Sequence, residues 1–313
     1  MSAWKILLTD GLEENGKEIL RKSADVVENP TISAEDLLKV VGEYDALIVR
    51  GRTKVNAAVF AAGTKLKVVG RAGVGVDNID LAAAKAHGVT VVNSPLATTV
   101  AVAELTMGLM LSAVREIARA DAGLKAGNWL KKGLEGSELY TKTLGVIGYG
   151  RIGSAVAQRA KAFEMKVLGY DPMIPADVIK ERGAEPASMD ELLAKSDFIT
   201  MHLPLTDQTR NMLNEAAFAK MKQGVYIICA ARGGVIDEAA LLAALNSGKV
   251  AGAALDVFAT EPPGVTELVS HPKVVGTPHI GAQTVEAQTR AAFDIAGEVL
   301  AALDGKPLRW KVA

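Results

Sequence analysis

The chain has 313 residues, of which 49% are hydrophobic and 23% are charged, and its formal net charge is -1. This length predicts two domains, and a charge near zero gives no electrostatic reason to expect a nucleic-acid partner. The single cysteine, Cys229, excludes an internal disulfide and is compatible with the cytoplasmic location that we expect.

Residues 4–92 alternate between short apolar runs and amphipathic runs, which predicts a parallel sheet covered by helices. The predicted strands are Lys5–Thr9, Asp25–Glu28, Ala46–Val49, Lys67–Arg71 and Thr90–Val92, and the predicted helices are Glu14–Lys22, Ala34–Val41, Asn56–Ala61 and Leu81–His87. Ser33 with Asp36 resembles a helix capping box. The chain enters its first strand without the charged and apolar segments of a signal peptide, so we expect no leader.

One long helix is predicted over Thr99–Ala120. Glu104 interrupts its apolar run, so we expect a buried helix and no membrane span. A basic segment follows, and its side chains Lys131 and Lys132 are predicted to be solvated.

The stretch from Leu144 to Asp171 reads as strand, G-x-G-x-x-G turn, helix and strand. The glycines at 148, 150 and 153 permit a tight turn, a close approach of a pyrophosphate, and packing of helix against strand. Phosphates bind the free N–H groups at such a helix N-terminus. Asp171 is placed to accept hydrogen bonds from a ribose 2′-hydroxyl and repels a 2′-phosphate, so NAD is favoured over NADP.

Four further apolar runs, at 197–201, 225–228, 252–256 and 273–276, are typical of strands buried on both faces. The last helix, Thr284–Leu303, is predicted to pack back onto the first domain. The predicted fold is α/β, with two doubly wound parallel-sheet domains and a cleft between them. A flavodoxin-like substrate domain is expected at 1–97 and 282–313, and a Rossmann nucleotide domain at 98–281.

Polar side chains follow the predicted strands, where ligands bind in such sheets. They are Arg50, Arg71, His202, Arg232, Asp256, Glu261 and His279. An arginine, a glutamate and a histidine in separate loops at one sheet edge make a coherent acid–base site. No metal site is predicted.

The order of the motifs resembles that of the D-isomer-specific 2-hydroxyacid dehydrogenases over nearly the whole chain. The matching segments are Gly70–Gly73, Gly75–Asn78, the Gly148 turn, Ala231–Gly234, Ala254–Phe258, Glu261–Pro263 and Pro278–Gly281. The resemblance implies NAD-dependent oxidation of a small anionic 2-hydroxy acid, with Arg232, Glu261 and His279 as catalytic residues. It also implies a homodimer formed through the Thr99–Ala120 helix, and a cation near Lys131 and Lys132 that reaches the partner's active site.

The roles of these residues agree with their chemistry. Histidine has an unperturbed pKa near neutrality, which suits His279 as the acid and base. Glu261 would orient the ring, and the planar fork of Arg232 would hold the substrate carboxylate. The implied substrate-binding residues are Arg50, Arg71, Val74, Gly75, Arg232 and His279. The implied cofactor-binding residues are Gly148, Gly150, Arg151, Ile152, Gly153, Asp171, Pro172, His202, Pro204, Thr209, Ala230, Arg232, Asp256, His279 and Gly281.

Arg50 and Arg71 match positions that contact the substrate phosphate in phosphoglycerate-oxidising members of that family. We therefore expect oxidation of D-3-phosphoglycerate to 3-phosphohydroxypyruvate, the first step of serine biosynthesis. The alternatives are a glyoxylate/hydroxypyruvate reductase, another D-2-hydroxyacid dehydrogenase acting for example on sulfolactate, or an NAD-sensing binding protein. Val74 departs from the threonine or serine often found in the phosphoglycerate enzymes. Because the sequence ends at Ala313, we expect no regulatory domain and no serine feedback through one.

Overall fold

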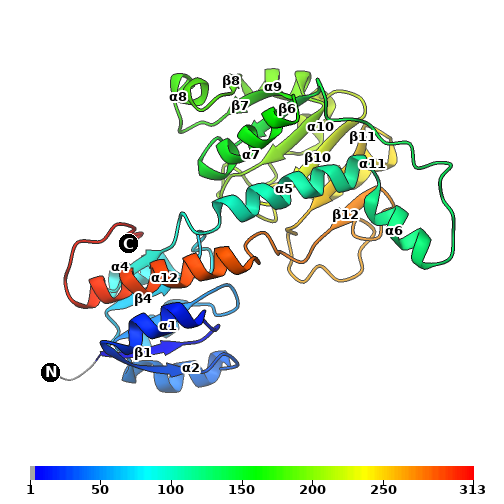
Figure 1. Cartoon of the computed structure of the whole chain (residues 1–313). Coiled ribbons are helices and arrows are strands. Elements are labelled where there is room, and N and C mark those ends of the chain that lie inside the picture. Colours follow the sequence, from blue (N-terminus) through cyan, green and yellow to red (C-terminus); the bar gives the residue numbers. More distant parts are fainter. Residues whose placement is uncertain (1–3) are drawn as a thin grey trace. The chain divides into compact units, whose positions relative to one another are not determined.

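The computed structural model in Figure 1 describes residues 4–313. The chain folds as two compact units, one made of the residues up to Thr98 together with Ala282–Ala313, the other of Thr99–Gly281. Each unit has its own parallel sheet. Residues 1–3, on which the expected absence of a leader partly rests, lie outside the described residues.

The first unit is built on a five-stranded sheet in the order β2-β1-β3-β4-β5, with every pair parallel. Its strands are β1 (Trp4–Leu8), β2 (Ala24–Glu28), β3 (Ala46–Val49), β4 (Val68–Arg71) and β5 (Thr90–Asn93). Its helices are α1 (Glu14–Arg21), α2 (Ala34–Val40), the 3-10 helix η1 (Val41–Glu43), α3 (Ala57–Ala62), α4 (Leu81–Ala86) and α12 (Val285–Leu303). This strand order is the flavodoxin-like one that was predicted.

Helix α12 lies close against this sheet because small residues face it. A Cβ on Gly70 of β4 would lie 2.5 Å from Val299 Cγ2 and 3.0 Å from Ile295 Cγ1. A Cβ on Gly16 of α1 would lie 2.7 Å from the carbonyl oxygen of Ala292. The chain end then returns to β5, where the Val91 N–H donates to the carbonyl of Ala313 at 3.0 Å.

The second unit contains a seven-stranded parallel sheet in the order β12-β11-β10-β9-β6-β7-β8. Its strands are β6 (Thr143–Ile147), β7 (Lys166–Tyr170), β8 (Glu185–Pro186), β9 (Phe198–Met201), β10 (Val225–Cys229), β11 (Val250–Leu255) and β12 (Val274–Gly276). Its helices are α5 (Thr99–Val114), α6 (Ile117–Lys125), α7 (Arg151–Ala162), α8 (Ala176–Glu181), α9 (Met189–Lys195), α10 (Glu215–Lys220) and α11 (Glu238–Asn246). The order is that of a doubly wound dinucleotide fold, so the prediction of two parallel α/β sheets is confirmed.

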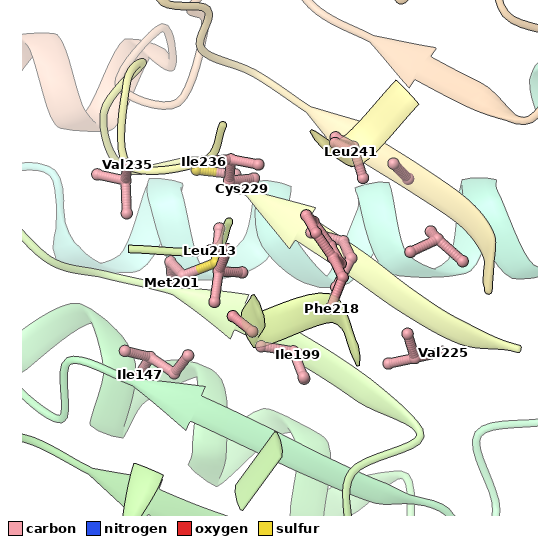
Figure 2. Close-up of a cluster of buried hydrophobic side chains, with 14 of the residues drawn as sticks. Ile147, Ile199, Met201, Leu213, Phe218, Val225, Cys229, Val235, Ile236 and Leu241 are labelled. Atoms are coloured by element: carbon pink, nitrogen blue, oxygen red, sulfur yellow. The ribbon is translucent and has the colours of Figure 1, made fainter. Parts of the chain in front are cut away.

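Both faces of this second sheet are buried, as its apolar strands predict. Figure 2 shows Ile147, Ile199 and Met201 of the strands in one cluster with Phe218 and Leu241, which belong to α10 and α11. The alternate strand residues point to the other face and join a second cluster with α5 and α7. Successive side chains of a strand point to opposite faces of the sheet, so the same strands contribute residues to two hydrophobic cores.

The predicted helix over Thr99–Ala120 is wrong, because the structure contains two helices, α5 and α6, in its place. Glu116 separates them with a φ of 50°, in the left-handed region. The backbone of Gly136 packs against the end of α5, where its Cβ would lie 2.4 Å from the Val114 carbonyl oxygen. This tertiary contact ends the helix, and no local glycine or proline announces it. Within residues 4–313, no helix combines the length and the apolarity that crossing a membrane requires.

Candidate active site

The turn between β6 and α7 needs two of its glycines for packing and leaves the third beside open space. Gly148 has a φ of 90°, and a Cβ there would lie 2.6 Å from the carbonyl oxygen of His202. A Cβ on Gly153 would lie 2.1 Å from the carbonyl oxygen of Gly148. A Cβ on Gly150 would have no atom of residues 4–313 within 4 Å. The backbone at Gly150 is therefore the accessible part of the turn.

Helix α7 begins at this accessible point without a side-chain cap. Its N-cap residue is Gly150, whereas α2 is capped by Ser33 and α11 by Asp237. The first N–H groups of a helix lack partners inside the helix, and the helix dipole favours an anion there. The turn and the uncapped start of α7 thus fit the pyrophosphate of a dinucleotide. The flanking Arg151 side chain is exposed and that of Ile152 is partly buried.

Asp171 directly follows β7, and its carboxylate lies against the glycine turn. Its Oδ2 accepts a hydrogen bond from the N–H of Tyr149 at 2.8 Å, and its Oδ1 accepts one from the N–H of Met173 at 2.8 Å. The structure therefore places a negative charge where the ribose of a bound dinucleotide is expected. Pro172 is exposed beside it.

His279 and Glu261 form a hydrogen-bonded pair at the carboxyl edge of the second sheet. The His279 Nδ1 lies 2.8 Å from Glu261 Oε2, and Glu261 Oε1 accepts the N–H of Phe258 at 3.2 Å. The side chains of His279 and Glu261 are 48% and 38% exposed, so a small molecule can reach the pair.

The environment of Glu261 keeps its carboxylate ionised. Partial burial is the largest single influence on the pKa of Glu261 and raises it, whereas the hydrogen bond with His279 and the charge of His279 lower it. The Phe258 N–H and the charge of Arg232 act in the same direction, and the net pKa lies below the ordinary glutamate value. An ionised carboxylate hydrogen-bonded to Nδ1 fixes the orientation of the ring.

Arg232 lies in the loop after β10, whose course is set by a glycine. A Cβ on Gly233 would lie 1.7 Å from the carbonyl oxygen of Phe258, so only glycine fits there. The Arg232 Nη1 donates to the carbonyl of Ala231 at 2.6 Å. The structure thus brings Arg232, Glu261 and His279 to one edge of one unit.

Asp256 directly follows β11, and its side chain is buried among groups of the His279 loop. It accepts hydrogen bonds from the Thr277 hydroxyl and from the N–H groups of Ile280 and Gly281. Thr277 and the Phe258 N–H were not identified from the sequence. Thr277 stands directly after β12, and its place at a strand end was the available signal.

The loop after β9 holds three predicted cofactor-binding residues. His202 Nε2 lies 3.1 Å from Thr200 Oγ1, and burial lowers the pKa of His202 to about 3, so its ring is neutral. The Thr209 hydroxyl is buried and donates to the carbonyl of Pro204 at 2.6 Å. Thr209 therefore stabilises the conformation of this loop through its hydrogen bond to Pro204. Ala230, after β10, is buried as well.

In the first unit, Arg71 is the last residue of β4, and its guanidinium lies over Gly73. A Cβ on Gly73 would lie 1.4 Å from Arg71 Nη1. The Gly73 carbonyl accepts the N–H of Ser94 at 2.9 Å, and the Val74 carbonyl accepts the Asn93 amide at 2.7 Å. Two carbonyls of the loop are thus held by Asn93, the last residue of β5, and by Ser94, which follows it.

The next two amides of that loop, those of Val74 and Gly75, donate no hydrogen bond to any group within residues 4–313. Two adjacent amides without partners, beside a guanidinium, make a surface that favours an anion.

Arg50 follows β3 and is held by contacts within the same unit. Its backbone N–H donates to Asp10 Oδ2 at 2.7 Å, and its Nη2 donates to Gln283 Oε1 at 2.9 Å. Arg52, two residues on, donates to the carbonyls of Ile32 and Thr9 and pairs with Asp10. Arg52 is therefore part of the framework, and Arg50 is the arginine presented at the loop.

The matches to known proteins agree with this geometry. The family model for "D-isomer specific 2-hydroxyacid dehydrogenase, NAD binding domain" matches residues 107–281. A D-3-phosphoglycerate dehydrogenase of Methanocaldococcus jannaschii is 49% identical over 303 residues, covering 96% of this chain and 58% of that protein. The Bacillus subtilis protein of the same name is 46% identical over 307 residues, covering 97% and 58%. The chain thus spans less than two thirds of these relatives.

Solved structures match over both units. A glyoxylate reductase from Paecilomyes thermophila gives a TM-score of 0.92 at 33% identity, covering 100% of this chain and 99% of that one. A D-lactate dehydrogenase from Aquifex aeolicus, complexed with NAD and lactic acid, gives a TM-score of 0.83 at 33% identity, covering 96% of each chain.

Proposed function

The chain belongs to the D-isomer-specific 2-hydroxyacid dehydrogenase family, and from that premise we propose that it oxidises D-3-phosphoglycerate to 3-phosphohydroxypyruvate with NAD. The observation that carries the proposal is the His279–Glu261 pair, 2.8 Å apart, beside Arg232 in the unit that matches the NAD-binding domain. The phosphoglycerate substrate is inferred from the relatives, which are D-3-phosphoglycerate dehydrogenases, and from Arg50 and Arg71 of the first unit.

The proton chemistry falls to His279. Because Glu261 occupies Nδ1, Nε2 is the nitrogen that takes the proton from the substrate hydroxyl. NAD, when bound, accepts the hydride that leaves C2 of the hydroxy acid. Glu261 remains ionised and stabilises the imidazolium that His279 becomes. In the reverse direction the same nitrogen protonates the new alkoxide.

The substrate anion is bound by donors of two kinds. The guanidinium of Arg232 holds the carboxylate and polarises the oxygen at C2, since its planar fork suits both. In the first unit, the amides of Val74 and Gly75, which donate to no group within residues 4–313, suit an anionic group of the substrate. Arg71 and Arg50 bind the phosphate, where two guanidinium groups suit a dianion.

The coenzyme is held by the Gly148 turn and selected by Asp171. The uncapped start of α7 would receive the pyrophosphate, and the Asp171 carboxylate would accept hydrogen bonds from the ribose hydroxyls. A 2′-phosphate would meet that carboxylate, which explains a preference for NAD.

A homodimer is part of the proposal. Four large apolar side chains on α6 and the chain after it are exposed: Ile117 52%, Leu124 59%, Trp129 81% and Tyr140 55%. Figure 1 shows α6 and this chain extending from the rest of their unit. Apolar exposure on this scale favours a second copy as its cover, which light scattering tests directly. The cytoplasmic location stays a prediction.

A second candidate, a glyoxylate or hydroxypyruvate reductase, is favoured by the glyoxylate reductase match. Val74 supports it too, because valine offers no hydroxyl to a phosphorylated substrate. A smaller substrate would leave Arg50 and Arg71 partly unused.

A substrate scan decides between these functions. NADH formation is measured with D-3-phosphoglycerate, D-glycerate, D-lactate and sulfolactate, each at matched NAD and NADP, and NADH consumption with glyoxylate and hydroxypyruvate. We expect the highest kcat/KM with D-3-phosphoglycerate and NAD. A higher value with glyoxylate or hydroxypyruvate would select the second candidate, and inactivity with all of them would select an NAD-sensing protein.

A further inference from the structure

Asp256 forms hydrogen bonds with residues that precede and follow His279 in the chain. Its Oδ1 accepts the Thr277 hydroxyl at 2.6 Å and the Ile280 N–H at 2.8 Å, and its Oδ2 accepts the Gly281 N–H at 2.8 Å. Its own carbonyl accepts the N–H of His279 at 2.8 Å. One residue, 1% exposed, therefore fixes four groups of the loop that carries the histidine.

The backbone of His279 needs such support. Its φ is 53°, in the left-handed region that residues with a Cβ adopt only at an energetic cost. Such conformations persist where surrounding contacts determine them. In this conformation the His279 Nδ1 lies 2.8 Å from Glu261 Oε2.

The loop is also built to let the carboxylate approach. A Cβ on Gly281 would lie 3.1 Å from Asp256 Oδ2 and 3.3 Å from Val102 Cγ2. Glycine at 281 thus lets its N–H reach a carboxylate that the Asp256 N–H, bonded to the Cys229 carbonyl at 2.8 Å, anchors to the sheet.

We propose that Asp256 is a positioning residue for the proton transfer, whose carboxylate fixes the 277–281 loop and so sets the place of His279 beside Glu261. The proposal rests on the proposed function and deepens it. It differs from the role implied by the family resemblance, in which Asp256 is a contact of the coenzyme. Both carboxylate oxygens already accept donors of the protein loop, which supports positioning as the main task.

The test uses Asp256→Asn together with Thr277→Val and Thr277→Ser. The amide nitrogen of asparagine cannot accept a hydrogen bond, so at least one donor of the loop loses its partner. We expect kcat to fall by about 10- to 100-fold in Asp256→Asn, because small misplacements of catalytic groups lower rates by such factors. Thr277→Val should lower kcat by about 3- to 10-fold, and Thr277→Ser, which keeps the hydroxyl, should restore it.

NADH affinity, measured by fluorescence without substrate, separates the two roles. Positioning predicts a Kd within about threefold of the wild-type value in every variant. A Kd weakened by about tenfold or more in Asp256→Asn, with kcat preserved at saturating coenzyme, would overturn the proposal in favour of a coenzyme contact. If Asp256→Asn does not fold, the Thr277 pair decides: equal kcat in the valine and serine variants overturns the proposal.

Asp197→Asn is the matched control. Asp197 precedes β9 at the opposite edge of the same sheet, and its Oδ2 also accepts a backbone N–H, that of Thr143, at 2.8 Å. Its loss should lower stability and leave kcat within about twofold.

A last readout does not depend on turnover. In the coenzyme-free protein, the rate at which diethylpyrocarbonate modifies His279 is followed by peptide mass spectrometry. Positioning predicts a changed rate in Asp256→Asn and Thr277→Val, and a wild-type rate in Thr277→Ser. An unchanged rate in all three contradicts positioning, whereas inactivity of the wild type with every hydroxy acid contradicts only the proposed function.

Discussion

Two loops, one in each unit, are built in the same way and present different chemistry. The loop after β3 is held by Asp10, which follows the neighbouring strand β1, and the loop after β12 is held by Asp256, which follows β11. Asp10 Oδ2 accepts the N–H groups of Arg50 and Thr53 at 2.7 and 3.1 Å. In both units, a carboxylate at a strand end organises the adjacent loop through its backbone amides.

The partners of the two carboxylates differ in charge. Asp10 also pairs with the Arg52 guanidinium at 3.2 Å, and its loop presents a second arginine, Arg50. The Asp256 side chain accepts hydrogen bonds from a hydroxyl and two amides, and its loop presents His279. The cationic loop suits anion binding and the neutral loop suits proton transfer. A substitution that disturbs the Asp10 loop should therefore change the affinity for the substrate, and one that disturbs the Asp256 loop should change kcat.

The largest effect should come from the second loop. His279→Gln removes the proton acceptor, so we expect turnover to fall by about 10²- to 10⁴-fold while NADH still binds. Steady-state kinetics with a fluorescence titration measure both quantities. His87→Gln, an exposed histidine of the first unit, serves as control. Near-normal turnover of His279→Gln would remove the acid–base assignment and the distinction between the loops.

Coenzyme choice should belong to the second unit alone. Asp171→Ser removes the charge beside the Gly148 turn, and we expect the preference for NAD over NADP to fall by about 10- to 100-fold, since a hydrogen bond to a charged group contributes about 1.5–3 kcal/mol. The ratio of kcat/KM values for the two coenzymes measures it. An unchanged ratio would show that other residues select the coenzyme.

A change in the first loop should act on KM. In Asp10→Asn the amide nitrogen cannot accept the N–H of Arg50 or Thr53, so Arg50 is held less firmly. We expect KM for D-3-phosphoglycerate to rise by about 3- to 10-fold, with kcat within about twofold. A fall in kcat without a change in KM would contradict the division of labour between the loops.

The smallest effect concerns the pH dependence of stability. The pKa of Glu261 is lowered in the folded chain, so its stabilising contribution is complete above the ordinary glutamate pKa and is lost as pH falls through the lowered value. Because Glu261 and His279 are 38% and 48% exposed, we expect Glu261→Gln to cost less than about 1 kcal/mol at neutral pH. Denaturant unfolding should show this gap closing below about pH 4. A gap that widens toward acid would contradict the sign.

Apolar runs were sufficient to predict both sheets, because buried parallel strands carry their signal locally. The Gly148 turn was likewise readable, since its glycines are required by contacts within one βαβ unit. The strand-end rule selected His279 and Glu261, whose side chains lie 2.8 Å apart in the structure.

The rest depends on tertiary contacts that no local pattern encodes. The helix breaks at Glu116 because the backbone of Gly136, from a later segment of the chain, packs against the end of α5. His279 has a left-handed backbone conformation although it is not a glycine, so the sequence does not predict this conformation. The hydrogen bonds that Asp256 accepts from its loop and that Gln283 accepts from Arg50 follow from loop conformation, which composition does not determine.

The most direct test of the account follows the hydrogen on C2. The purified chain is incubated with NAD and D-3-phosphoglycerate deuterated at that carbon, and the coenzyme is analysed by mass spectrometry. The account predicts that the deuterium is recovered in the reduced coenzyme, at a rate that His279→Gln abolishes. Deuterium released to water, or reduced coenzyme formed equally fast without His279, would contradict it.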